Sequence, residues 1–175
     1  MTRELLLLLL GFSLIVVQGA LGAVVDLGVL MPNPILPLVI YLAMSSDVSL
    51  ARGAGLSFLI GFLFDSATGN AMGLFTFVHE ASFLVARGAG VRLIVRGRLS
   101  QMMITALAAG LSSATVIALL RIFRPAGRAA MSSPAHATLA VLASALATGL
   151  ISPLVFQLAR RVDSLRRREE GAPAL

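Results

Sequence analysis

The sequence of 175 residues contains no cysteine, no tryptophan, no lysine and only one tyrosine, Tyr41. Without cysteine the chain has no disulfide framework, no thiolate nucleophile and no cysteine-based zinc or iron–sulfur site. Charged residues make up only 13% of the chain, against roughly 25% in an ordinary soluble domain. Hydrophobic residues make up 58%, which leaves too little polar side chain to cover a water-soluble globule. We therefore expect a single membrane domain.

The residue patterns of common catalytic and metal sites are also missing. His79 and Glu80 would begin the zinc motif HExxH, but its second histidine falls at position 83, which is Phe83. The sequence contains no GxSxG elbow, no P-loop and no dinucleotide-binding glycine pattern. We predict a protein that is not an enzyme and binds neither metal nor cofactor. The basic residues stand at the ends of apolar runs, which argues against nucleic-acid binding.

Long uncharged runs dominate what is present. The first, Leu5–Val25, has 21 residues and as a helix would reach about 31 Å, matching a hydrocarbon core of about 30 Å. It exceeds the roughly 7–15 apolar residues of a signal peptide, so we expect it to be retained, although Ala20–Ala23 offers the small residues of a cleavage site. The other five apolar runs are Leu27–Ser46, Gly53–Phe64, Leu74–Ala86, Leu99–Leu120 and Ala137–Ala159, and among them only Leu74–Ala86 contains a charged residue, Glu80.

These six runs predict an all-α polytopic membrane protein, a six-transmembrane-helix bundle over residues 1–161 with a basic cytoplasmic tail at 162–175. The second span should be short and begin near Pro34, because it contains three prolines, and we expect Pro37 to interrupt it. Turn-forming residues at 66–73 predict a tight hairpin between the third and fourth spans.

The distribution of arginine predicts the orientation. With the N-terminus inside, 11 of the 14 arginines fall on the cytoplasmic side, so the positive-inside rule places both termini in the cytoplasm. Three exceptions, Arg121, Arg124 and Arg128, lie in a predicted exposed outer loop and are candidate partner-binding residues. A re-entrant hairpin at 99–120 would bring them inside, but that run has no proline and only Gly110 near its centre, which favours a continuous span.

Asp65 and Glu80 are the acidic residues that we expect nearest to membrane depth. Asp65 belongs to a series with four-residue spacing, Gly61, Asp65, Gly69 and Gly73, which we interpret as a structural hairpin whose carboxylate binds the backbone of the following turn. Glu80 lies deeper, where a carboxylate costs roughly 2.5–3.5 kcal/mol. It should therefore face other helices, either neutral or accepting a hydrogen bond from Ser82 or a neighbouring span. It is either a partner or substrate contact or a residue that fixes helix register.

Small residues at four-residue spacing predict close helix packing. They occur on the third span at Gly53, Ser57 and Gly61, and on the sixth span over Ala140–Thr148. The fifth span carries the series Ala106, Gly110, Ala114 and Ala118, which we take as candidate partner-binding residues. The five arginines after Ala159 form either an ordinary stop-transfer flank or a contact with anionic lipid or the cytoskeleton.

The segment Gly61–Leu74, GFLFDSATGNAMGL, resembles the MreD family of the bacterial cell-elongation machinery, and Asn33–Met44, NPILPLVIYLAM, is similar to the family's proline-led apolar segment. Ala71 stands where the family pattern has proline. The resemblance implies a non-enzymatic scaffold of the bacterial inner membrane, acting in peptidoglycan synthesis and rod shape. Such a scaffold would bind MreC directly and help connect MreB to RodA and its class B transpeptidase, in contact with membrane lipid.

One alternative comes from another functional class, the substrate-binding S component of an energy-coupling-factor vitamin transporter, which also has six spans. Such a subunit needs a polar, aromatic-lined pocket open to the outside. The near absence of tyrosine and tryptophan favours the scaffold.

Overall fold

The structure, a computed structural model, describes residues 3–25, 30–69, 72–89, 97–123 and 134–170. Within these ranges it contains helices and no strand, which confirms the all-α prediction. The helices are α1 (Arg3–Val24), α2 (Ile35–Met44), α3 (Leu50–Thr68), α4 (Leu74–Gly88), α5 (Arg98–Phe123) and α6 (Pro134–Glu170).

Four of these helices are long and apolar enough to cross a membrane: α1, α3, α5 and the 137–164 part of α6. The other two are shorter, with ten residues in α2 and fifteen in α4. At about 1.5 Å per residue, α2 reaches about 15 Å, half the thickness of a hydrocarbon core. A membrane protein with several spanning helices is therefore supported, while six complete crossings stay a prediction.

Helix α2 lies at the centre of the bundle and contacts each of the other five helices. It begins directly after Pro34, as the sequence predicts, and eight of its ten residues are buried. Pro37 does not interrupt it, contrary to our expectation. It occupies the first turn, where the backbone N–H that proline lacks would have no intrahelical partner in any case.

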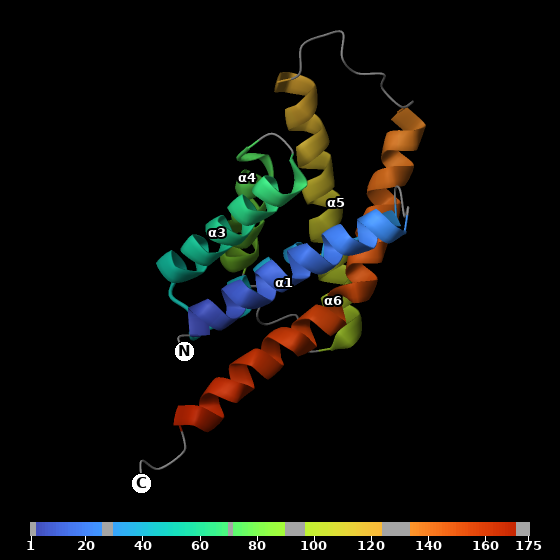
Figure 1. The fold of residues 1–175 in the computed structure, drawn as a ribbon. Helices are drawn as coiled ribbons and strands as arrows, with labels where there is room; N and C mark the ends of the chain where they lie inside the picture. Colours follow the sequence, from blue (N-terminus) through green and yellow to red (C-terminus); the bar gives the residue numbers. More distant parts are fainter. Residues whose placement is uncertain (1–2, 26–29, 70–71, 90–96, 124–133, 171–175) are drawn as a thin grey trace.

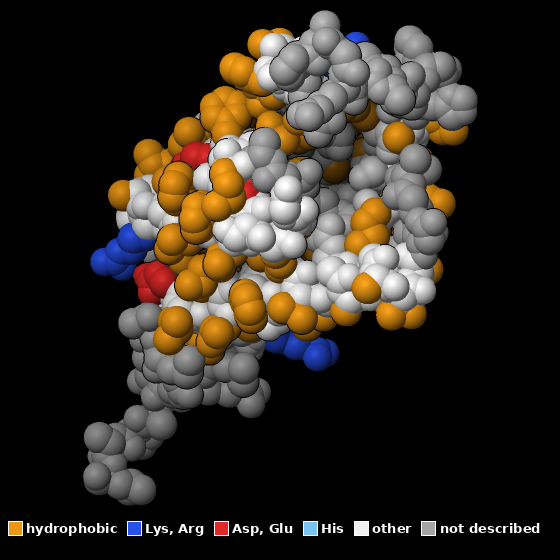
Figure 2. Space-filling model, turned by 45° about the horizontal axis from the view of Figure 1, so that its top comes forward, with side chains coloured by type: hydrophobic (Ala, Val, Ile, Leu, Met, Phe, Trp, Pro, Cys, Tyr) orange, Lys and Arg blue, Asp and Glu red, His pale blue; other side chains and the backbone are white. Residues whose placement is uncertain are grey.

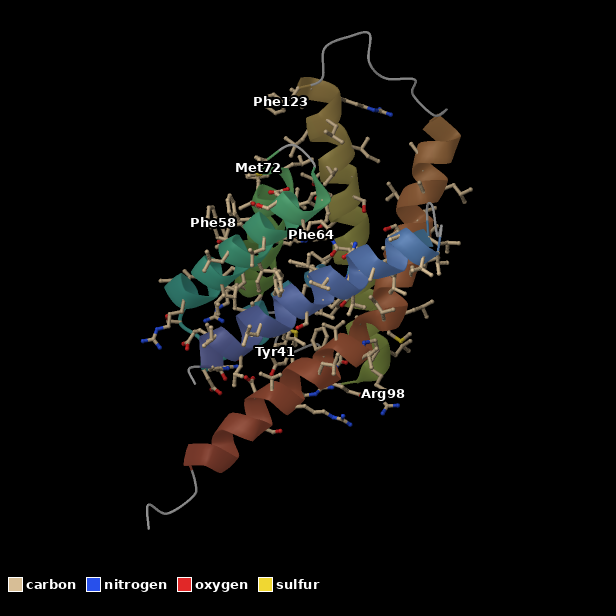
Figure 3. All side chains as sticks on the ribbon, viewed as in Figure 1. Tyr41, Phe58, Phe64, Met72, Arg98 and Phe123 are labelled. Atoms are coloured by element: carbon tan, nitrogen blue, oxygen red, sulfur yellow. The ribbon has the colours of Figure 1, made fainter. Side chains whose placement is uncertain are left out.

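The bundle is built around two antiparallel pairs, α3 with α4 and α5 with α6, which make the most extensive contacts between helices. Helices α1 and α2 complete the half that contains α3 and α4, and the α5–α6 pair lies beside that half (Figure 1). Both chain ends lie toward the same end of the bundle (Figure 1). Figure 3 places Tyr41 and Arg98 toward this end, and Met72 and Phe123 at the opposite, hairpin end.

The outer surface of the helices is apolar. Figure 2 shows hydrophobic side chains across the visible face, with arginine side chains at the margins of the coloured area. On α6 the exposed large residues recur at helical spacing, namely Leu139, Leu142, Leu146, Leu150 and Leu154. An apolar stripe of this length facing outward is typical of contact with lipid.

Candidate functional site

Asp65 joins the end of α3 to the start of α4. Its side chain is fully buried. One carboxylate oxygen, Oδ2, accepts hydrogen bonds from Gly73 N at 3.0 Å, Thr76 N at 2.9 Å and Thr76 Oγ1 at 2.6 Å, while Oδ1 accepts one from Phe75 N at 2.9 Å. These backbone groups belong to the first turn of α4, where N–H groups have no intrahelical acceptor. Asp65 therefore caps α4 from a neighbouring helix.

The three glycines of the hairpin have different roles. Gly69 and Gly73 adopt positive φ angles of 64° and 90°. Residues that carry a Cβ atom rarely adopt this conformation. Gly61 lies against the backbone of α4, since a Cβ atom there would come within 2.8 Å of Thr76 Cα. The small side of α3 thus lets α4 approach closely enough for Asp65 to reach its N-terminus.

The third helix is longer than the sequence predicts. We expected turn residues from Ser66 onward, but α3 continues to Thr68. The hydroxyl groups of Ser66 and Thr68 donate to the carbonyl oxygens one turn earlier, at Phe62 and Phe64. Asp65 consequently lies in the last turn of α3 and faces α4 from the side.

Glu80 lies on α4 beside Ser57 of α3. Its Oε2 atom and the Ser57 hydroxyl are buried, and neither has a hydrogen-bond partner in the part of the chain that the structure describes. Ser82 is not the partner of Glu80 that we expected. Its hydroxyl donates to the Val78 carbonyl at 2.7 Å and lies 3.0 Å from the Ser112 hydroxyl of α5.

The small-residue series on α5 divides into two parts. Ala106 and Gly110 face α6, because a Cβ atom on Gly149 would lie 2.8 Å from Ala106 Cβ and one on Gly110 would lie 3.9 Å from Ala145 Cβ. Ala114 and Ala118, nearer the hairpin end, are exposed. The first half of the series, Ala106 and Gly110, is thus covered by α6. The second half, Ala114 and Ala118, is exposed, and we call it the open half.

Arg121 is exposed in the last turn of α5. Arg124 and Arg128 lie outside the described residues, so the predicted grouping of the three arginines in an outer loop stays a prediction.

A buried ion pair that the sequence analysis missed closes the opposite end of the bundle. Arg3 Nε lies 2.8 Å from Asp163 Oδ1, and Arg3 Nη2 lies 2.7 Å from Asp163 Oδ2. The Tyr41 hydroxyl donates to Oδ2 at 2.6 Å, and Arg3 Nη2 also donates to the Ser45 hydroxyl at 2.6 Å. This cluster ties α1, α2 and α6 together. No sequence signal links residues 160 positions apart.

A cavity of about 340 Å³ opens between the six helices, each of which contributes at least one lining residue. Its polar lining residues are Gln18, Asn33, Ser112, Ser113, Ser144 and Thr148. Asn33 is held in place because its N–H donates to Thr148 Oγ1 at 3.0 Å and its Nδ2 lies 3.3 Å from Nε2 of the buried His79. Phe64 and Phe75 form part of the wall. No pattern in the sequence predicts this cavity.

The described residues contain no group of three or more His, Cys, Asp or Glu side chains that could hold a metal ion. The apolar helices pack through small residues. A capped hairpin closes the bundle at one end, and a buried ion pair closes it at the other. These features define an integral membrane protein of the helix-bundle class. Residues 2–162 match the family model described as rod shape-determining protein MreD. The chain therefore belongs to the MreD family of rod-shape-determining membrane proteins. Searches of curated proteins and of solved structures return no match.

Proposed function

We propose that this protein is a non-enzymatic scaffold of the cell-elongation complex in the bacterial inner membrane. In this role it binds MreC through its transmembrane helices and helps link MreB to RodA and its class B transpeptidase. Membership of the MreD family supports the general role in rod shape. The observation that carries MreC binding is the open half of the small-residue series on α5.

Ala114 and Ala118 differ from the other small residues of the predicted packing series because no helix in the described part of the chain covers them. Gly53 and Gly61 meet side-chain or backbone atoms of α4, and Ala106 meets α6. Helix association in lipid depends on close van der Waals packing, which small residues permit. An exposed pair of alanines one turn apart is therefore a suitable contact for the single helix of a bitopic partner such as MreC.

The proposal includes an orientation of the bundle in the membrane. The termini share one end of the bundle (Figure 1). Four exposed arginines lie at that end: Arg52 in the first turn of α3, Arg98 at the start of α5, and Arg160 and Arg161 on α6. By the positive-inside rule this end faces the cytoplasm. Ala114 and Ala118 then lie in the outer half of the membrane, and α2 and α4 complete six crossings.

Affinity isolation from native membranes tests this proposal. The wild-type chain should recover MreC, while Ala114→Leu and Ala118→Leu should recover several-fold less, because a leucine holds an incoming helix away. Glu80→Ala tests the alternative buried contact on α4. Ala51→Leu, an equal enlargement at an exposed position of α3, is the matched control and should leave recovery unchanged. Wild-type recovery in all three test variants would contradict binding at these positions.

The cavity favours a second candidate function, that of a substrate-binding S component. Its polar lining and two phenylalanines are features that a small-molecule pocket requires. If this were the function, isolation should recover an ATPase and a coupling subunit in place of MreC, and a water-soluble vitamin should raise the thermal unfolding temperature.

A further inference from the structure

The end of the α5–α6 pair that we assign to the cytoplasm carries three exposed arginines. Arg98 begins α5, and Arg160 and Arg161 lie on α6. Among the residues whose side chains the structure describes, which exclude 165–170, no carboxylate forms an ion pair with any of the three. The nearest acidic residue in sequence, Asp163, is already bound by Arg3 and Tyr41.

The packing of the two helices brings these arginines to one place. Helices α5 and α6 run antiparallel, with Gly149 against Ala106 and Ala145 near Gly110. Continuing this register along α6, past Pro153, brings Arg98 level with position 157, about 4.5 Å along the axis from Arg160. Figure 3 shows Arg98 toward the same end of the bundle as Tyr41, and Arg160 lies near Tyr41. Three positive charges thus lie together at the inner end of one helix pair.

The position along α6 indicates what binds there. The sequence from Ala137 to Ala159 has 23 uncharged residues, about 35 Å of helix, which is enough to cross the hydrocarbon core. Arg160 and Arg161 follow at once, at the depth of the lipid phosphates. Guanidinium groups form paired hydrogen bonds with phosphate oxygens, and a soluble acidic protein would not reach this depth without displacing lipid.

We propose that Arg98, Arg160 and Arg161 form a binding site for the headgroup of an anionic phospholipid in the inner leaflet. This inference does not depend on MreC binding. Each arginine near an anionic surface should strengthen binding about fivefold, so that the three together favour an anionic lipid over a neutral one by roughly 100-fold. The site would fix the α5–α6 pair against the membrane surface.

Lipid binding to the full chain in detergent micelles, titrated separately with phosphatidylglycerol and phosphatidylcholine and read by native mass spectrometry, tests the proposal. The wild-type chain should prefer phosphatidylglycerol. The triple variant R98Q/R160Q/R161Q should lose this preference, and R98K/R160K/R161K should retain most of it, because lysine preserves the charge. Equal preference in the wild-type chain and the triple glutamine variant would overturn the proposal.

Single variants separate a defined site from general attraction between charges. Arg98→Gln should weaken phosphatidylglycerol binding about fivefold. Arg52→Gln is the matched control, since Arg52 is an exposed arginine in the first turn of α3 that lies 3.7 Å from Glu4, and it should have no effect. Equal losses in both variants would contradict a localised site. Displacement of the lipid by an equal concentration of soluble glycerol phosphate would show a site for free phosphate and would also overturn the proposal.

Discussion

Removal of the Asp65 carboxylate should destabilise the bundle more than any exposed substitution. In Asp65→Ala, the Thr76 N–H and hydroxyl lose their acceptor inside a buried contact, while the N–H groups of Gly73 and Phe75 lie closer to the surface. An unpaired buried donor costs about 1–3 kcal/mol. Two such donors at Thr76 give an expected loss of about 4 kcal/mol.

Asp65→Asn provides a graded comparison. With the amide oxygen in the place of Oδ2, it keeps the acceptor for Gly73 and both donors of Thr76, and loses only the bond from Phe75 N. The expected loss is about 1–2 kcal/mol. Ser66→Ala is the control, since the exposed Ser66 hydroxyl bonds only to its own helix, and it should stay within about 0.5 kcal/mol of wild type.

The fraction of protein that remains monodisperse on size exclusion after heating in detergent measures these differences. For a chain of this size a loss of 1 kcal/mol lowers the melting temperature by roughly 2–4 °C, so Asp65→Ala should melt about 8–16 °C below wild type, with Asp65→Asn between the two. If Asp65→Ala melts together with Ser66→Ala, the carboxylate does not stabilise the hairpin and the reasoning is refuted.

Three further predictions follow from the packing and the charges. Asp163→Ala should cost about 3–5 kcal/mol because it leaves Arg3 buried without its anion, and a melting temperature equal to wild type would contradict this. Gly149→Leu should reduce the yield of folded protein because α6 approaches α5 closely there, whereas Gly19→Leu should be tolerated, since nothing lies within 4 Å of its added Cβ; equal yields would contradict the close packing. A reporter fused after Arg128 should give an external signal, and a cytoplasmic signal would contradict six crossings.

The helices could be predicted from the sequence because lipid imposes its own pattern, a run of uncharged residues with arginine at the ends. This pattern locates α1, α5 and the apolar part of α6 to within a few residues. It could not show that Pro37 lies harmlessly in the first turn of α2, because that depends on where the helix begins. It also could not predict that α3 continues past Asp65 to Thr68, because Ser66 and Thr68 favour turns but here bond to carbonyl groups of their own helix.

The candidate site was predictable only where spacing along one helix carries the information. The four-residue spacing from Gly61 to Gly73 indicates the hairpin, and the series on α5 indicates a packing face. The half of that face that stays exposed depends on where α6 crosses α5. The sequence of α5 alone does not specify this crossing point. The ion pair between Arg3 and Asp163 likewise depends on how the start of α1 packs against α6, which no local pattern in the sequence shows.

Site-specific photo-crosslinking in native membranes tests most directly whether the open half of α5 binds MreC. Because the chain has no cysteine, single cysteines can be introduced at positions 114 and 118 and labelled with a benzophenone reagent. Position 110, which faces α6, and position 154, which is exposed on α6, are the controls. The account predicts MreC adducts at 114 and 118 and none at 110 or 154. Absence of adducts at 114 and 118, or equal yields at 154, would contradict it.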